Sequence, residues 1–285
     1  MANTIADRVY RDKYRKATLD HLLRRALVAE AICEVDRSDN KRIQSPYSST
    51  PTATVQAITG TYNTAEYQTT DDTLTVTDEV IVGEHIFDFE EVLTQFDVFS
   101  NRVEQTAFEV ANKIDRFVLN NIVDNAEGAY STPAGGFSKA NINEIFSNLI
   151  SKVSGFAEAY KGLFVVVENT EVPGLIEAMA TNGFSFADAA LKNGFMTSYM
   201  GVDIHVTRAG TFADETLGTT TYTNANHRLF GVKRVATYAS PRGVRFEEKM
   251  VSGKTGVELV TYGYIGVKVW KPIEDLLVDI TIVAS

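Results

Sequence analysis

Residues 92–121 read VLTQFDVFSNRVEQTAFEVANKIDRFVLNN, and they carry the strongest periodic signal in the chain. Apolar residues recur there at intervals of three or four, at Val92, Phe96, Phe99, Val103, Ala107, Val110, Ile114 and Phe117. No glycine or proline interrupts the sequence between Gly83 and Gly128. This spacing is typical of one face of an α-helix, and about thirty residues at 1.5 Å each span about 45 Å. The sequence therefore predicts one long amphipathic helix with a buried face.

Downstream of this helix the pattern predicts a mixed series of helices and strands. Asn141 followed by Glu144 has the spacing of a capping box, so a second helix is expected to begin there. Residues 163–167 form a short continuous apolar run, which is typical of a central strand in a buried sheet. Pro173 fits the first turn of a third helix. We expect further strands at 202–206, 228–232 and 244–250, a surface loop at 211–226, and strand throughout the last forty residues.

Upstream of the long helix the sequence predicts two appendages that lack a core of their own. The first forty residues are expected to be helical, because leucine and alanine recur at helical spacing from Leu19 to Ala31. Residues 45–72 are polar, and a period of two then begins at Leu74. We expect a hairpin whose returning strand lies at 55–58. Such a hairpin is barely stable alone in water, so it implies a neighbour on which it lies.

Composition excludes some classes of protein. The formal net charge is -10, so the chain does not bind nucleic acid by bulk attraction. Residues 1–42 carry ten Lys or Arg and seven Asp or Glu, so an arm of net charge +3 precedes a body of net charge -13. The single cysteine, Cys33, excludes an intrachain disulfide and predicts a small buried side chain in a protein made in a reducing cytoplasm. No signal peptide is recognisable, and the longest apolar runs are too short to span a bilayer.

The sequence contains no recognisable catalytic motif. Residues 252–255 read SGKT, but Glu248 stands where a phosphate-binding loop needs its first glycine. The four histidines are scattered, without the spacing of zinc ligands. A group of carboxylates near the hairpin could hold calcium, or it could be charge on an edge strand that blocks unwanted pairing, which is the interpretation we prefer. Its members are Asp71, Asp72, Asp78 and Glu79. We predict no catalytic residue, cofactor or metal.

The order of these elements resembles that of the HK97-like major capsid proteins of tailed bacteriophages, over essentially the whole chain. Short stretches carry the same likeness. Residues 71–80 resemble the base of that family's E-loop, and 88–117 resemble its spine helix, with ANKID at 111–115 similar to a recurrent segment. Residues 164–169 and 200–207 resemble strands of its A-domain, and 262–269 resemble a returning strand of its P-domain.

The resemblance implies an α+β fold with an N-terminal arm, an E-loop hairpin, a long spine helix, a P-domain and an A-domain. The domains that it implies are a helical arm at 1–44, the E-loop at 45–88, the P-domain with its spine helix at 89–162, the A-domain at 163–235, and C-terminal strands of the P-domain at 236–285.

The resemblance also implies a function without enzymatic activity. Members self-assemble into pentamers and hexamers of an icosahedral head that encloses double-stranded DNA. The expected location is the virion, with assembly in the cytoplasm of a bacterial host. Expected partners are other copies of the chain, a separate scaffolding protein, a portal and, as a further candidate, a cement protein. DNA would be enclosed without sequence-specific binding, and no membrane is involved. No lysine occurs between Lys41 and Lys113, so the covalent E-loop cross-link of some members is not expected.

Seven residues are candidates for contacts between subunits, and two rival interpretations stay open. The arginines of the arm could face scaffold or DNA, but we favour pairing with acidic residues of a neighbour. The candidates are Arg8, Arg11, Arg15, Tyr62, Tyr67, Asp71 and Asp72. The closest rival is an encapsulin-type nanocompartment shell protein, which has the same fold. The other rival is a phage decoration or tail protein, which the long helix disfavours because tube and fibre subunits are mostly β.

Overall fold

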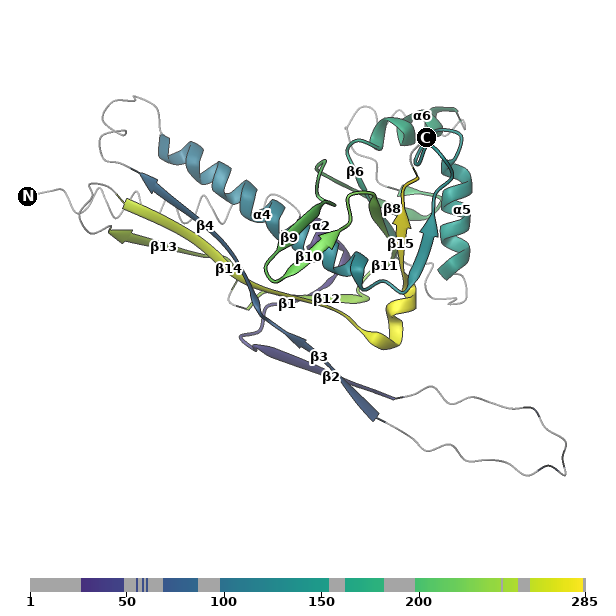
Figure 1. Ribbon diagram of the computed structural model, residues 1–285, viewed down its shortest axis with the longest axis horizontal. Coiled ribbons are helices and arrows are strands. Elements are labelled where there is room, and N and C mark those ends of the chain that lie inside the picture. Colours follow the sequence, from purple (N-terminus) through teal and green to yellow (C-terminus); the bar gives the residue numbers. More distant parts are fainter. Residues whose placement is uncertain are drawn as a thin grey trace, which may run out of the picture.

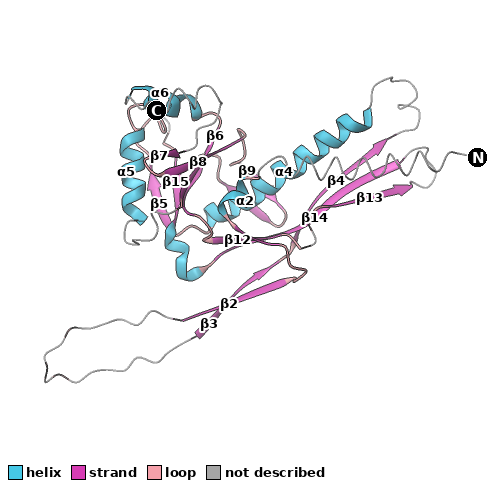
Figure 2. Ribbon diagram, turned by 180° about the vertical axis from the view of Figure 1, so that it is seen from behind, coloured by secondary structure: helices cyan, strands magenta, loops and turns pink. Residues whose placement is uncertain are grey.

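The computed structural model of the chain describes residues 27–48, 55, 58, 60, 69–86, 98–153, 162–181, 198–241, 243–250 and 257–283. Helix α4 (Val98–Asp124) lies against two sheets, and a two-stranded hairpin projects away from both (Figures 1 and 2). Helices and sheets are both present, so the α+β class predicted from the sequence is confirmed.

The predicted long helix is confirmed as α4, which has 27 residues and is about 40 Å long. Val110, Ile114 and Phe117 are buried as the pattern requires, and the earlier apolar positions lie outside the described side chains. The C-terminal half is enclosed on more than one face, because Val118, Leu119, Ile122 and Val123 are also at most 4% exposed. This half of the helix is therefore a core element rather than a surface helix.

The first sheet is built around one long strand, β14 (Val257–Val269). Along its first half β14 pairs with both β4 (Asp78–Ile86) and β13 (Arg245–Met250), and along its last residues it pairs with β12 (Ala236–Ala239). Alternate residues Leu259, Thr261 and Ile265 are buried. Helix α4 contacts both β14 and β4, so it covers a face of this sheet. A 3-10 helix, η1 (Lys271–Leu276), separates β14 from the last strand, so the prediction of strand throughout the last forty residues was wrong.

The prediction of helix through the first forty residues was wrong beyond residue 32. The structure has a short helix, α2 (Val28–Ile32), and then a strand, β1 (Glu34–Asp36). The strand forms because the chain pairs in parallel with β12, and the N–H of Arg234 donates to the carbonyl of Ile32 at 2.7 Å. Residues 1–26, which include most of the predicted arm, lie outside the described residues.

The second sheet has six strands and is covered on both faces. Their order is β5 (Gly128–Ser131), β15 (Leu277–Thr281), β11 (His227–Val232), β6 (Leu163–Glu168), β8 (Val202–Thr207) and β7 (Ser198–Tyr199). Strand β6 is central, as predicted. Its residues Leu163, Val165 and Val167 pack with α5 (Ile142–Val153) and α6 (Val172–Thr181), while Phe164 and Val166 pack with α4. Burial on both faces explains its continuous apolar sequence.

The predicted surface loop at 211–226 is instead a small hairpin. Strands β9 (Asp214–Leu217) and β10 (Thr220–Thr223) pair across a two-residue turn, in which Gly218 has a φ of +62°. The prediction failed because the strands are short and rich in threonine. Phe212, Leu217 and Tyr222 are buried in the same core as α4, so the hairpin is fixed to that helix.

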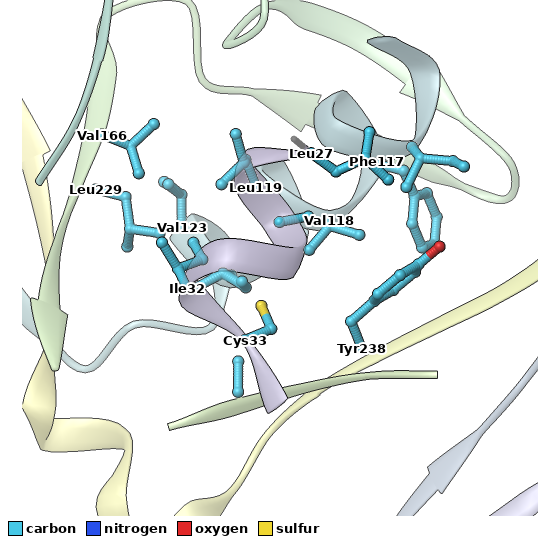
Figure 3. Close-up of a cluster of buried hydrophobic side chains, with 14 of the residues drawn as sticks. Leu27, Ile32, Cys33, Phe117, Val118, Leu119, Val123, Val166, Leu229 and Tyr238 are labelled. Atoms are coloured by element: carbon cyan, nitrogen blue, oxygen red, sulfur yellow. The ribbon is translucent and has the colours of Figure 1, made fainter. Parts of the chain in front are cut away.

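A carboxylate of α4 caps the short helix α2. Asp115 accepts hydrogen bonds from the N–H groups of Ala29 at 2.9 Å and Val28 at 3.3 Å. Around α2, side chains from α4, β6 and β11 converge, and Figure 3 shows Ile32 among Val118, Val123, Val166 and Leu229. Burial raises the pKa of the Cys33 thiol to about 12, which fits the small buried side chain predicted from the sequence. The Asp115 cap of α2 thus lies beside the apolar cluster that surrounds Ile32.

Asp115 makes stability depend on pH. Burial raises its pKa to about 6, although the two N–H groups oppose the shift. Between about pH 4 and 6 the folded chain then holds this proton more tightly than the unfolded chain, so stability falls as pH rises through that window. Replacing Asp115 by Asn should remove about 1–3 kcal/mol of this pH dependence. The measurement is the free energy of unfolding in denaturant at pH 4, 5, 6 and 7.

The matched control is Glu109→Gln, which neutralises an exposed carboxylate of the same helix. It should keep the slope of the wild type between pH 4 and 6. An unchanged slope in Asp115→Asn would contradict the role given to Asp115.

Candidate functional site

The hairpin that leaves the body is formed by β2 (Arg42–Ser48) and β3 (Thr69–Thr75). The strands are antiparallel, with Arg42 opposite Thr75 and Ser48 opposite Thr69. The prediction of a returning strand at 55–58 was therefore wrong, and Val55 and Ile58 are not in a strand. The sequence did not predict β2 as a strand, because this segment is polar and contains Pro46. A two-stranded ribbon tolerates proline because both of its strands are edge strands.

Only the root of the hairpin is packed against the body. Leu74 is 1% exposed and Val76 is 7% exposed, and they form a small cluster with Ala239, Ile43 and Trp270. Beyond Asp72 the described residues of both strands are mostly exposed. Val55 and Ile58 are fully exposed, at 104% and 106%. Large apolar side chains in that position favour a partner surface outside this chain.

Asp72 fastens the root of the hairpin. One oxygen, Oδ1, lies 2.8 Å from the Nζ of Lys268 and accepts the N–H of Thr73 at 3.0 Å, and Oδ2 accepts the N–H of Lys271 at 3.2 Å. Burial alone would raise the pKa of Asp72, but the Lys268 ammonium and the two N–H groups together lower it. Both carboxylate oxygens are used within the chain. The geometry thus gives Asp72 an intramolecular role, and its contact with another subunit stays a prediction.

Of the other six predicted contact residues, only Asp71 lies within the described part of the chain. Asp71 is exposed on β3, opposite Pro46. The five remaining candidates lie outside the described residues, as does the SGKT stretch at 252–255. They are Arg8, Arg11, Arg15, Tyr62 and Tyr67.

The other polar residues singled out in the sequence are dispersed. Asp78, at the start of β4, accepts the hydroxyl of Thr77 at 2.8 Å. His205 lies on β8, where burial and the nearby Lys233 lower its pKa, and its ring meets the ring of Phe164 edge-on. Among the described residues, no group of three or more His, Cys, Asp or Glu side chains could hold a metal ion. Within the same part of the chain, no helix is long and apolar enough to cross a membrane.

The sequence analysis missed a buried ion cluster in the second sheet. Arg228 is 4% exposed, and its guanidinium contacts Glu168 at 3.2 Å and the Oε1 of Glu171 through Nε at 2.8 Å. Glu168 also accepts the N–H of Phe212 at 3.0 Å, and the guanidinium lies over the Phe212 ring. The sequence feature that could have predicted this cluster is a charged residue in each of two apolar strands, Glu168 in β6 and Arg228 in β11. The cluster joins β6, the turn before α6 and β11 to the loop before β9.

Comparison with solved structures identifies the fold. The chain is similar to the capsid structure of the cyanophage P-SCSP1u, with a TM-score of 0.69 and 14% identity over 91% of this chain and 89% of that chain. It is similar to the mature capsid of bacteriophage PhiM1, with a TM-score of 0.66 and 12% identity over 89% and 86%. It also resembles a virus-like particle from Pyrococcus furiosus, with a TM-score of 0.63 and 13% identity over 94% and 98%. No protein-family model and no curated protein matches the sequence. The chain therefore has the HK97-like fold of phage capsid subunits.

Asp72→Ala should loosen the hairpin without unfolding the body. The change removes the acceptor for two N–H groups and leaves Lys268 without its partner. We expect the amides of Thr73 and Thr75 to exchange with solvent about tenfold faster in the unassembled protein, a change of about 1.4 kcal/mol. Because the pKa of Asp72 is lowered, its stabilisation is present at neutral pH and is lost as pH falls below about 4. Hydrogen–deuterium exchange measures both effects.

Asp71→Ala is the control, because Asp71 is the exposed neighbour of Asp72. Its exchange rates should match those of the wild type. Equal rates in Asp72→Ala and Asp71→Ala would show that Asp72 does not fasten the hairpin.

Proposed function

We propose that the chain is a major capsid protein, which self-assembles into pentamers and hexamers of an icosahedral phage head enclosing double-stranded DNA. The observation that carries this proposal is a fold match along nearly the whole length of both chains with a cyanophage capsid, at 91% of this chain and 89% of the other. The protein acts by assembly and has no enzymatic activity. Its location is the virion, and it assembles in the cytoplasm of a bacterial host.

The proposed parts of a capsid subunit correspond to described elements. Helix α4 is the spine helix of the P-domain at 89–162. Strand β3 and the part of β2 from residue 45 onward belong to the E-loop at 45–88. The A-domain at 163–235 includes β6, β8 and β11. Strand β15, at the end of the 236–285 segment, and β5, in the 89–162 segment, both pair into the sheet that contains β6, so we assign these two strands to the A-domain sheet. Residues 1–44 supply the N-terminal arm, although β1 already belongs to the body.

Assembly follows from segments that the subunit leaves uncovered. The hairpin beyond Asp72 lacks a core, and a hairpin of this kind needs further strands or a packed face for stability. A segment of one copy that lies on a different surface of the next copy makes a heterologous contact, which closes into a ring when the rotation allows. Each such contact can be weak, because a closed shell makes many of them together. The proposed contact residues are Arg8, Arg11, Arg15, Tyr62, Tyr67, Asp71 and Asp72.

The proposed partners follow from the same assignment. Copies of the chain are the first partner, followed by a separate scaffolding protein, a portal and a cement protein. DNA is enclosed without sequence-specific binding. The net charge of -10 supports this, because an acidic wall repels phosphate and keeps the packaged DNA from adhering.

An encapsulin-type nanocompartment shell is the second candidate. The likeness to a virus-like particle from Pyrococcus furiosus, at a TM-score of 0.63 over 98% of that chain, is a likeness of fold and does not favour the nanocompartment over a phage head. Two phage capsids match with higher TM-scores, 0.69 and 0.66, and other phage structures match at 0.61 and 0.58. Phage structures are the more frequent likeness, so the phage assignment is preferred. A decoration or tail protein fits less well, because the spine helix of 27 residues is foreign to mostly β tubes and fibres.

Electron microscopy of the purified recombinant protein tests the proposal. The protein is expressed alone, then together with a candidate scaffolding protein from an adjacent gene, and then together with the terminase and portal proteins from adjacent genes. We expect closed icosahedral particles or sheets of hexamers, and DNA inside the particles in the last case. Shells that fill with a co-expressed cargo enzyme instead would favour the nanocompartment. A monodisperse monomer or dimer under every condition would contradict both.

A further inference from the structure

A polar pocket of about 400 Å³ lies between α4 and the loop that follows β8. Helix α4 contributes side chains at positions 109, 112, 113 and 116, a spacing that places them on one face. The loop contributes residues 208–211. The proposed spine helix and the proposed A-domain thus each supply one wall.

The loop wall of this pocket is held in place. The Thr211 hydroxyl donates to the carbonyl of Arg208 at 2.7 Å, and the Thr211 carbonyl accepts the side-chain amide of Asn120 at 2.9 Å. Asn120 is itself 1% exposed on α4. Gly210 has a φ of +78°, a conformation that permits the tight turn. The pocket is therefore preformed in the isolated chain.

The pocket has more cationic donors than its own carboxylates use. Lys113 lies 2.6 Å from the Oε1 of Glu215, and Arg116 contacts Oε2 of the same carboxylate through Nη2. Arg208 is paired only at 3.8 Å, with Glu109. Three cations and two carboxylates leave a local charge of +1, on a chain whose net charge is -10.

Two N–H donors of the pocket have no acceptor. The Nδ2 of Asn112 and the Nε of Arg116 are buried atoms, and neither has a hydrogen-bond partner in the part of the chain that the structure describes. Buried donors are almost always satisfied in native proteins, because an unmade hydrogen bond leaves the group desolvated without compensation. The Oε2 of Glu215 is also a buried atom without a hydrogen-bond partner, so it accepts from neither of these N–H groups, although the Nη2 of Arg116 lies against it. Both donors are therefore open to an acceptor from outside the chain.

A second pocket with apolar residues adjoins the first. It has a volume of about 280 Å³, shares Asn112, Arg208 and Thr211 with the first, and adds Phe108 and Val206. Val206 is 39% exposed, and the Arg208 guanidinium lies 5.5 Å above the Phe108 ring. Asp115 also lines this second pocket, but its carboxylate accepts the N–H groups of α2. The combined surface suits an acidic side chain followed by an apolar one.

We propose that this pocket binds an Asp or Glu carboxylate of a second copy of the chain. The inference rests on the proposed function, because it assigns one of the contacts that hold a shell together. An amide N–H and a guanidinium N–H are the donors that a carboxylate accepts in charge-assisted hydrogen bonds. The first pocket, counted with Glu215, has a local charge of +1, which matches one carboxylate. A site that follows DNA phosphates needs a run of unpaired cations, and the acidic chain repels DNA. The chain has 37 Asp and Glu residues, so a second copy can supply the ligand.

Asn112→Asp tests the proposal, because it places a carboxylate of the chain's own beside the unpaired donors. The unassembled variant should unfold at the wild-type temperature or above, since Lys113, Arg116 and Arg208 then have a further partner within the chain. Its assembly should be impaired, because the neighbour's carboxylate is excluded and repelled. We expect the protein concentration needed for shell assembly to rise about tenfold, which corresponds to 1.4 kcal/mol per contact. A residue with a structural role alone would not combine these two effects.

Asn226→Asp is the control, since it makes the same change of charge at an exposed position. It should assemble at the wild-type concentration. Assembly of Asn112→Asp at that concentration would overturn the proposal. Electron cryomicroscopy of wild-type shells should place a neighbour's carboxylate beside Asn112 and Arg116. A pocket open to solvent, filled by the chain's own residues, or holding phosphate only in DNA-filled particles would also overturn it. If the wild type forms no shell, the proposed function itself fails.

Discussion

The enclosure of the C-terminal half of α4 is the constraint around which the molecule is arranged. From Val110 to Val123 most side chains of the helix are buried, and they pack against residues of both sheets. A helix buried on several faces cannot shift without opening both cores, so it fixes the two sheets as one body. Polar groups of the same helix extend this hold. Asp115 caps α2, and Asn120 fixes the loop at Thr211.

What this body leaves outside determines how the chain can work. The hairpin β2–β3 is joined to the body by a small apolar cluster and by the contacts of Asp72, and its described residues farther out have little packing. A rigid body with a projecting hairpin that lacks packing partners is suited to repeated heterologous contacts. Each copy can place its hairpin on the next copy and receive the hairpin of another on its own surface. The N–H donors of Asn112 and Arg116 that lack an acceptor are, on our proposal, a second and polar surface for contact with a neighbouring copy.

Sequence reasoning succeeded where one local signal determined the structure. The period of α4, the apolar run of β6 and the polar start of α5 each follow from a few consecutive residues and their burial. It failed where pairing partners lie far apart, since nothing local in the polar β2 announces its pairing with β3. At the candidate site, exposure of Asp71 was foreseeable. The inward turn of Asp72 was not, because Lys268 is distant in sequence and reaches it only through the folded sheet.

Hydrogen–deuterium exchange on assembled and unassembled protein tests the central claim, that a neighbouring copy covers the hairpin. The account predicts that the amides of 42–48, apart from Pro46, and of 69–75 become at least about tenfold more protected on assembly. Amides of β6, which is buried in the single chain, should change little. Equal exchange of the hairpin in shells and in free protein would contradict the account, because the ribbon would then be as exposed in the shell as it is alone.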